Sequence, residues 1–387
     1  MGEIKSFWLD KKNCTGCGAC ANICPKNAIT MHVDSMGFMY PAINDSCINC
    51  NLCEKICNER LSLTNQHPLR VYACWSKDTE NRFYSTSGGL VGEIVAPILK
   101  AGGYVIGAAY DEDNLVEHIS IHSINDLKKI QQSKYLQSDS KKIYKETKEL
   151  LDCGQRVAFT GTPCQIAALK AYLRHDYENL LTIDFICRGV NSPKAYQAWL
   201  KEIEEKYLSK ITSVWFKYKV GGWKSSPKRT KLHFDNGKDL VLEGNDNLYM
   251  SGYLGPNLYI RPSCGNCAFK GSERNSDLTV ADFWGIEKEF DDDKGTSMVM
   301  LNSLKGQAAW NDMIDNIQYA EKDVQEAING NPCFRESVSI NPNSELFLKM
   351  LDNTSFSKAL SKFYKKPIFL LRAIGRAKHF VKKILGN

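Results

Sequence analysis

Cysteine is the residue type with the clearest chemical pattern in this chain. Eight of the fifteen cysteines lie within the first 57 residues, in two runs with the same spacing, C-x2-C-x2-C-x3-C. The first run is Cys14, Cys17, Cys20 and Cys24, and the second is Cys47, Cys50, Cys53 and Cys57. Thiolates at this spacing bind 4Fe-4S clusters, and the fourth cysteine of each run is a ligand of the other cluster. We therefore predict one cluster on Cys14, Cys17, Cys20 and Cys57, and another on Cys47, Cys50, Cys53 and Cys24.

The spacing of these cysteines has a physical reason. Three thiolates that follow one another closely can surround one cubane in a tight loop, whereas the fourth lies too far along the chain and reaches the neighbouring cluster. Gly16 and Gly18 allow backbone amides to approach the sulfurs. The run is typical of bacterial two-cluster ferredoxins. Zinc and a disulfide framework are the alternatives, but zinc sites rarely repeat this run and disulfide scaffolds belong to small secreted chains.

Four of the other cysteines share a setting at the ends of predicted elements. Cys164 and Cys187 follow predicted buried strands over residues 156–160 and 180–186. Cys264 and Cys267 form a C-x2-C loop bounded by Pro and Gly. Because strand ends at one edge of a parallel sheet converge, these four could bind one more metal centre. A zinc knuckle or a redox pair stays open for the C-x2-C loop.

Two predicted helix starts carry small polar residues. Ser87, Gly88 and Gly89 precede a helix over residues 90–100, and Gly161-Thr162-Pro163 leads from the strand over 156–160 into a helix over 165–173. Free backbone N–H groups at a helix start bind phosphates and other anions. An ordinary N-cap is the simpler interpretation of the Ser-Gly-Gly stretch alone. The macrodipole of the second helix favours a thiolate at Cys164.

The remaining pattern predicts an α+β or α/β chain with a ferredoxin-type domain, a larger domain and a tail. Residues 1–62 form the two-cluster ferredoxin-like domain, with short strands over 28–33 and 38–42. Residues 68–155 and 156–330 form two parts of one mixed α/β flavin-binding domain, and residues 331–387 form a helical basic tail. Further expected elements are helices over 123–132, 141–151 (exposed) and 192–207, strands over 104–110 and 211–219, a hairpin with strands 230–234 and 239–242, and two helices between Leu301 and Ile328.

Composition narrows the class of protein. The hydrophobic fraction of 43% and the charged fraction of 24% are ordinary for a soluble globular protein. We find no apolar run long enough to span a membrane and no N-terminal apolar signal region, so we expect a cytoplasmic protein. Many cysteines in such a chain indicate a reducing compartment and metal binding. The body carries no basic stripe interleaved with aromatic residues, which argues against nucleic acid as a partner.

The motifs, taken in order, resemble the beta subunits of coenzyme F420-reducing hydrogenases and dehydrogenases. The resemblance covers roughly residues 71–300 and rests on Ser87-Gly88-Gly89, Ser133-Lys134-Tyr135, Gly161-Thr162-Pro163-Cys164-Gln165, Cys187-Arg188-Gly189-Val190, Ser192-Pro193, Cys264-x-x-Cys267 and Ala281-Asp282-Phe283-Trp284-Gly285. The preceding cysteine-rich region is similar to the longer members of this family, in which ferredoxin-like and flavin domains are fused.

This resemblance implies FAD and a third 4Fe-4S cluster. It implies cluster ligands at Cys164, Cys187, Cys264 and Cys267, and a flavin pocket formed by Ser87, Gly88, Gly89, Lys134, Tyr135, Ser138, Thr160, Gly161 and Thr162. The free helix-start N–H groups and the charge of Lys134 suit phosphates. Asp282 and Trp284 match the acidic and aromatic strand end of the family, with no step assigned to them. The alternative for Asp282 is a helix cap or loop brace, and no catalytic residue is named.

The sequence therefore predicts an iron–sulfur flavoprotein oxidoreductase. It would pass electrons between 4Fe-4S clusters and FAD and exchange hydride with a deazaflavin-type or other organic substrate. Its expected partners are a redox protein or low-potential electron donor. The alternatives are a non-catalytic electron-transfer subunit of a larger redox complex, a binding module that has lost its flavin site, and a reductase associated with polysaccharide biosynthesis. Gly221-Gly222-Trp223-Lys224 resembles the bacterial branch of the family that includes this last class.

The C-terminal end of the chain is strongly basic. From Asn353 to Asn387 it holds nine Lys or Arg residues and no Asp or Glu, so the rest of the chain is mildly acidic. Apolar residues from Leu370 to Leu385 recur at helical spacing opposite basic ones. This pattern predicts an amphipathic helix in peripheral contact with the inner face of the membrane or with an acidic partner.

Overall fold

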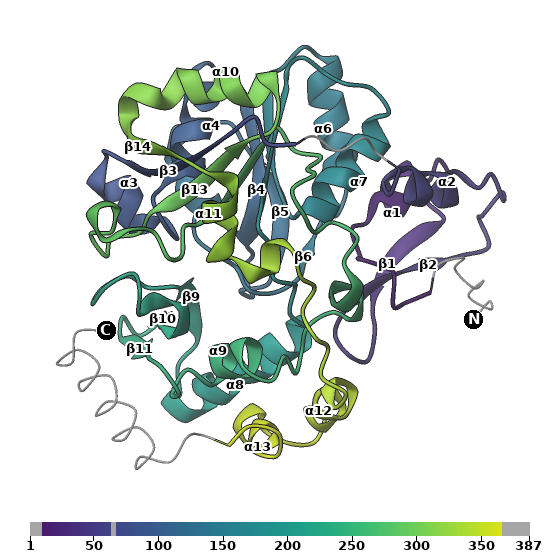
Figure 1. Cartoon of the computed structure of the whole chain (residues 1–387). Coiled ribbons are helices and arrows are strands. Elements are labelled where there is room, and N and C mark those ends of the chain that lie inside the picture. The colour runs from purple at the N-terminus through teal and green to yellow at the C-terminus, as the bar shows by residue number, and fades with distance from the viewer. Residues whose placement is uncertain (1–9, 63–66, 366–387) are drawn as a thin grey trace.

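The computed structural model describes residues 10–62 and 67–365 and confirms a mixed α/β chain (Figure 1). The N-terminal unit pairs β1 (Ile29–Val33) with β2 (Met39–Ile43) and adds α1 (Ala19–Ile23) and α2 (Leu52–Glu59). The predicted amphipathic segment over 370–385 lies outside the described residues. None of the described helices is long and apolar enough to cross a membrane.

A nine-stranded sheet forms the centre of the molecule. Its strands, in spatial order, are β14 (Ile317–Lys322), β3 (Arg70–Ser76), β13 (Ser297–Leu301), β12 (Leu278–Asp282), β8 (Leu180–Phe185), β7 (Val157–Thr160), β4 (Tyr104–Tyr110), β5 (Val116–Ile121) and β6 (Ser138–Asp139). The strands from β12 through β8 and β7 to β4 are parallel. The carboxyl ends of these strands therefore meet at one edge, where α/β proteins bind ligands.

Helices cover both faces of this sheet. On one face lie α4 (Leu90–Lys100) and α10 (Leu304–Met313), which bury Val95 and Trp310 in the same apolar cluster. On the other face lie α6 (Ile143–Asp152), α7 (Pro163–Leu173) and α11 (Val324–Asn329). Phe159 of β7 packs with α6 and α7, whereas its neighbour Ala158 packs with α4, because successive side chains of a strand point to opposite faces. The short helices α3 (Thr79–Tyr84) and α5 (Leu127–Ile130) complete this region.

A second lobe lies below the sheet in Figure 1. It contains the three-stranded sheet of β9 (Ile211–Phe216), β10 (Thr230–Phe234) and β11 (Asp239–Leu242), together with α8 (Pro193–Tyr207), α9 (Leu248–Leu254), α12 (Ser344–Met350) and α13 (Phe356–Ser361). Its core is rich in aromatic residues, including Tyr196, Trp199, Phe216 and Tyr249. The predicted hairpin and the predicted helix up to Tyr207 are confirmed.

The N-terminal unit is fixed to the body through a buried arginine. Arg261 is fully buried and donates Nε–H to the carbonyl of Cys14 (2.8 Å) and an Nη2–H to that of Met39 (2.9 Å). Its Nη1 donates to Oε1 of Gln137 (3.0 Å). Hydrogen bonds from a buried charge to groups of both parts favour one relative position, so the cysteine-rich unit is held against the central sheet.

Several predicted elements differ in the structure. The two helices expected after Leu301 are separated by β14. Only one residue of this edge strand, Ile317, is buried, so its sequence carries no clear hydrophobic alternation. The helix α6 is not an exposed helix, because Ile143, Tyr144 and Leu151 are buried against α7 and β7. The helix expected over 123–132 is reduced to a 3-10 turn (Ile124–Asp126) and the single turn of α5.

Candidate functional site

The first predicted cluster set surrounds a small cavity in the N-terminal unit. Cys14, Cys17, Cys20 and Cys57 all line it, although Cys57 comes from α2 and the others come from the loop before α1 and from α1 itself. Burial raises the pKa of Cys20 well above its ordinary value, and the nearby Cys17, Cys14 and Cys57 raise it further. The structure therefore brings together the four residues that the spacing assigned to one cluster.

The second predicted set lies farther out. Cys24, Cys47 and Cys53 pack together around Ala21, Ile29 and Ile43, and Cys50 is exposed. Burial raises the pKa of Cys53, and Cys50 and Cys24 act in the same direction. Cys24 thus lies beside Cys47 and Cys53 of the second run, although Cys20 of its own run packs against the same residues. The exchange of the fourth ligand stays a prediction. We call the two sets the inner and the outer N-terminal cysteines.

The third set lies at the carboxyl edge of the central sheet. Cys164 is in the first turn of α7, and Cys187 follows β8. Cys264 lies in the 3-10 turn Pro262–Asn266, and Cys267 directly follows this turn. Burial raises the pKa of Cys187, and Cys264, Cys164 and Cys267 raise it further, so these four are electrostatic neighbours. Within residues 10–62 and 67–365, no three His, Cys, Asp or Glu residues are arranged to hold a single metal ion, and none of the fifteen cysteines forms a disulfide.

One large cavity joins this third set to the predicted flavin pocket. Its volume is about 540 Å³, within the range of roughly 300–1,000 Å³ that is common for small-molecule sites. Both predicted sets line it. The cysteines are Cys164, Cys187, Cys264 and Cys267, and the flavin-pocket residues are Ser87, Gly89, Lys134, Tyr135, Ser138, Thr160, Gly161 and Thr162. Cys17 of the inner N-terminal set also reaches this cavity.

Gly88 is the one predicted pocket residue that does not line this cavity. Its N–H donates to Oγ of Ser297 (2.8 Å), so this amide is already satisfied. A Cβ at this position would lie 2.6 Å from the carbonyl oxygen of Cys74. Gly88 therefore allows the turn to pass close to β3 and β13, and the amide that the sequence suggested as an anion donor is used within the protein.

Two nitrogen groups, of Lys134 and His118, line the cavity without an acidic partner in the described part of the chain. Lys134 donates its Nζ–H groups to the carbonyls of Gln131 (2.7 Å) and Gln132 (3.4 Å), and burial lowers its pKa to about 7. His118, which no sequence motif singled out, has Nδ1 2.7 Å from Oγ of Ser138, while its buried Nε2 has no hydrogen-bond partner among the described residues. Burial lowers the pKa of His118 to about 4. The alternation of β5, in which Val116 and His118 point inward, was the signal for this residue.

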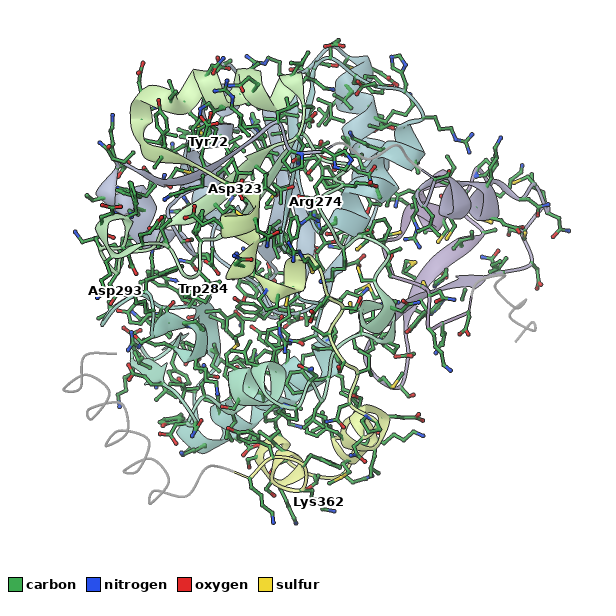
Figure 2. The ribbon with its side chains drawn as sticks, in the orientation of Figure 1. Tyr72, Arg274, Trp284, Asp293, Asp323 and Lys362 are labelled. Atoms are coloured by element: carbon green, nitrogen blue, oxygen red, sulfur yellow. The ribbon has the colours of Figure 1, made fainter. Side chains whose placement is uncertain are left out.

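A buried ion pair explains where Asp282 and Trp284 lie. Oδ2 of Asp282 is 2.5 Å from Nζ of Lys217, whose side chain is only 2% exposed. Trp284, labelled in Figure 2, stacks on Trp223 with ring centroids 4.2 Å apart, and Lys217 Nζ lies 5.1 Å from the ring of Trp284 and 5.8 Å from that of Trp223. Lys217, Asp282 and Trp284 all line the large cavity. Asp282 is therefore the counter-ion of a buried lysine. This role differs from both a helix cap and a loop brace, the alternatives that the sequence left open for Asp282.

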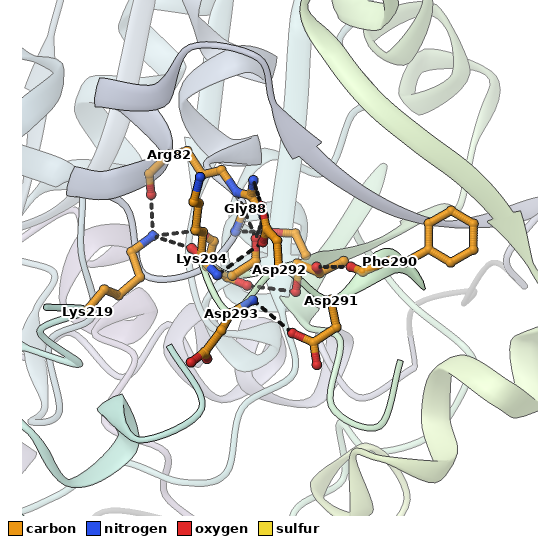
Figure 3. A network of polar contacts seen from close by, with 12 residues as sticks. Arg82, Gly88, Lys219, Phe290, Asp291, Asp292, Asp293 and Lys294 are labelled. Atoms are coloured by element: carbon orange, nitrogen blue, oxygen red, sulfur yellow. Dashed lines mark hydrogen bonds and ion pairs between the residues drawn. The ribbon is translucent and has the colours of Figure 1, made fainter. Parts of the chain in front are cut away.

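A polar network holds the Ser-Gly-Gly turn in place (Figure 3). Arg82 binds both carboxylate oxygens of Asp292 (2.8 and 2.6 Å) and the carbonyl of Gly295. Lys219 donates to the carbonyls of Arg82, Ser87 (2.9 Å) and Lys294 (3.2 Å). Gly295 has φ +104°, and a Cβ there would lie 2.8 Å from the backbone of Ser87. These contacts fix the turn before α4 against the loop that precedes β13.

The surroundings of the third set fit an iron–sulfur cluster. Four thiolates around a cubane carry net negative charge, which buried cations stabilise. Nζ of Lys270 donates to the carbonyls of Cys187 (2.6 Å) and Cys333 (2.7 Å), and Arg274, labelled in Figure 2, lines the same cavity. Nε of Arg274 is buried without a hydrogen-bond partner in the described part of the chain. The donor set and its cations suit such a group.

Comparison with known proteins supports these assignments at the level of domains. Residues 154–327 match the family described as the C terminus of the coenzyme F420 hydrogenase/dehydrogenase beta subunit, and residues 7–30 match the 4Fe-4S binding domain. One subunit of the F420H2 dehydrogenase of Methanosarcina mazei is 24% identical over 185 residues, which are 45% of this chain and 53% of that protein. The chain thus aligns with about half the length of this relative.

Two other curated relatives come from Methanocaldococcus jannaschii. An iron–sulfur subunit of CoB–CoM heterodisulfide reductase is 32% identical over 83 residues, which are 18% of this chain and 13% of that protein. An uncharacterized ferredoxin is 35% identical over 49 residues, which are 13% of this chain and 64% of the ferredoxin. These two relatives therefore align with short parts of the chain.

A solved structure is also similar. It is a chain of the F420-reducing [NiFe] hydrogenase complex from Methanosarcina barkeri, with 16% identity and a TM-score of 0.47, and the alignment covers 77% of this chain and 91% of that one. The two family matches identify the domains themselves. This chain carries a ferredoxin-type 4Fe-4S binding domain followed by a domain of the coenzyme F420 hydrogenase/dehydrogenase beta subunit family.

Proposed function

We propose that this chain is an iron–sulfur flavoprotein oxidoreductase that passes electrons between three 4Fe-4S clusters and FAD. The observation that carries this proposal is the single cavity of about 540 Å³, which is lined by the third cysteine set and by eight of the nine predicted flavin-pocket residues. Cys17 of the inner N-terminal set lines the same cavity. Candidate cluster ligands thus lie beside a candidate cofactor pocket in one site.

The three cysteine sets differ in their exposure to solvent and in their contact with this cavity. Cys50 of the outer set is exposed, Cys14 of the inner set is buried, and Cys164 of the third set lines the cavity. We assign the outer set as the point of exchange with an external redox protein. Electrons would then pass through the inner and the third sets to the cavity, or in the reverse direction.

The cavity contains groups that suit FAD. The 11-residue helix α4 begins at Leu90, directly after Gly89 in the sequence. Its N-terminus therefore offers backbone amides and the positive end of the helix dipole to a phosphate. Lys134 adds an amine that donates to the backbone carbonyls of Gln131 and Gln132, and the buried Nε2 of His118 offers one more polar contact. When bound, FAD would supply the exchange between single electrons and hydride. The protein would orient the cofactor and keep water from it.

The organic substrate belongs to the same proposal. A deazaflavin is one candidate, because the M. mazei relative is named for F420H2, and another hydride donor or acceptor is the other. Lys217, Asp282 and Trp284 lie on the wall of the cavity and offer a charged and an aromatic surface to a planar ring.

A second candidate function is electron transfer without substrate chemistry, as a component of a larger redox complex. The names of two relatives favour it, because both are subunits of multi-component redox enzymes. The exposed Cys50 and the neighbouring Ile48, which is 57% exposed, would suit docking of a redox protein. Both functions use the same iron–sulfur series and differ only in what binds the cavity.

Cofactor analysis of the full chain, purified without oxygen, tests the proposal. We expect about twelve irons per chain, which is three cubanes, and one FAD. Reduced deazaflavin or another hydride donor should then bleach the visible absorbance. Lys134→Ala should weaken flavin retention, whereas Lys129→Ala, which removes an exposed lysine of α5, should not. Absence of flavin with full iron would favour the electron-transfer component, and absence of both would refute the proposal.

A further inference from the structure

A buried arginine lies between the inner N-terminal cysteines and the third set. Arg60 follows α2, is only 4% exposed, and lines the small cavity of the inner set. Its Nη1 donates to Oγ1 of Thr15 (2.7 Å) and to Sγ of Cys17 (3.4 Å). Its guanidinium carbon lies 5.8 Å from the ring centre of Phe269, which lines the large cavity. Figure 1 shows α2 beside α7, the helix that carries Cys164.

The electrostatic neighbours of Arg60 are the sulfurs of both sets. Burial alone would lower its pKa, but Cys17, Cys57, Cys164 and Cys14 together raise it above its ordinary value. A guanidinium stays protonated at all working pH values, so this is a permanent positive charge. Its Nε is buried and has no hydrogen-bond partner among the described residues.

We propose that Arg60 raises the reduction potential of the inner N-terminal cluster, and so makes it a better electron acceptor from the outer cluster. The inference rests on the cluster part of the proposed function and is independent of FAD. Reduction adds one negative charge to a cluster, and a buried cation that donates to a ligand sulfur stabilises that charge. Lys26 and Lys55, the lysines that flank the outer cysteines in the sequence, are exposed. Charges in water act weakly on a cluster.

The electron balance of this step is simple. The outer cluster loses one electron and the inner cluster gains it, and no proton moves, because Arg60 keeps its charge in both states. Arg60 is also near the third set, since Cys164 is one of its electrostatic neighbours. The charge of Arg60 therefore acts on the inner N-terminal cluster and on the third cluster, which are the last two centres before the large cavity in the proposed path.

Arg60→Gln in the full chain tests this inference. Redox titration followed by EPR measures the reduction potential of each cluster. In Arg60→Gln, one N-terminal cluster should have a lower potential, so that its ratio of reduced to oxidised form drops about tenfold at a fixed donor potential. A tenfold change in this ratio is 59 mV for one electron. A Cys17→Ser variant identifies which signal belongs to the inner cluster. Lys55→Gln removes an exposed charge from α2, the helix that ends just before Arg60, and should leave both N-terminal potentials unchanged.

Two outcomes would overturn the inference. The first is an unchanged inner potential in Arg60→Gln with full iron content. The second outcome is measured in Arg60→Lys and applies even if Arg60→Gln loses iron. Because lysine keeps the positive charge, a fall in the inner potential that corresponds to a tenfold change in the ratio of reduced to oxidised cluster would contradict the inference. An iron content below about eight in the unaltered chain would instead count against the two N-terminal clusters of the proposed function.

Discussion

Removing the carboxylate of Asp282 should destabilise the domain that lines the large cavity. Lys217 and Asp282 form a pair with 2.5 Å between Nζ and Oδ2, and their side chains are 2% and 20% exposed. Lys217 has φ +55°, in the left-handed region that few lysines adopt. The backbone thus directs this lysine inward, and Asp282 is the carboxylate that faces its ammonium group. Asp282→Asn would leave a buried charge without its counter-ion.

The size of the effect follows from burial. Breaking a buried ion pair by removing one partner costs about 3–5 kcal/mol. Because Asp282 is partly exposed, water can approach the freed ammonium, and we expect about 3 kcal/mol, at the lower end of that range. Lys217→Met combined with Asp282→Asn removes both charges. The loss in this double variant should be smaller than the sum of the two single losses by about 2 kcal/mol.

Urea unfolding followed by tryptophan fluorescence measures these free energies. Trp223 and Trp284 stack beside the pair, so their fluorescence reports on this region. The control is Glu345→Gln, which breaks the exposed pair of Glu345 with Lys349 on α12 and should change the unfolding midpoint very little. If Asp282→Asn is no more harmful than this control, or if the single losses simply add, Lys217 does not depend on Asp282 and the reasoning is refuted.

Three further predictions address other parts of the chain. Changing Cys264 and Cys267 together to Ser should remove about four irons and leave the two N-terminal clusters, by iron analysis; unchanged iron would make them structural thiols. Burial lowers the pKa of His118 to about 4, so the unfolded chain takes up a proton first as pH falls. The unaltered chain should therefore lose stability between about pH 6.5 and 4, and His118→Gln should show a flatter dependence in urea unfolding; equal slopes would contradict this. The full chain should co-sediment with anionic vesicles more than a chain that ends at Tyr364, and equal binding by both would make the basic tail ordinary surface.

The sequence predicted those features whose signal is local. Cysteine spacing is local, and the structure brings Cys24 to the second run and Cys57 to the first. The bounds of α4 and of the hairpin of β10 and β11 are confirmed, because their signals are also local: the Ser-Gly-Gly stretch before α4, Gly102-Gly103 after it, and the turn at Asn236-Gly237. The predicted pocket residues lie on one cavity, apart from Gly88. That they hold FAD stays a prediction.

The features that the sequence did not predict depend on contacts between distant segments. Arg60 is a single cation after a helix until folding places it against Cys17 and near Cys164. Lys217 follows β9 in the stretch Lys217-Tyr218-Lys219, and only the folded chain shows that it has a positive φ and is buried against Asp282. The local sequence does not predict the contacts of Arg60 with Cys17 or of Lys217 with Asp282. The two partners of each contact are far apart in sequence, and their burial depends on tertiary packing.

Cys164 shows how tertiary burial reverses a local argument. Its position at the start of α7 suggested a thiolate, because the helix dipole favours negative charge there. In the folded chain, burial instead raises the pKa of Cys164 to about 12, and the hydrogen bond with Thr162 offsets only part of this. Burial also raises the pKa values of Cys187 and Cys264. These three side chains therefore favour the neutral thiol, and a cluster that binds them must itself displace their protons. The helix dipole alone does not keep Cys164 deprotonated. Because cluster binding must release thiol protons, iron loading should become less favourable as the pH is lowered.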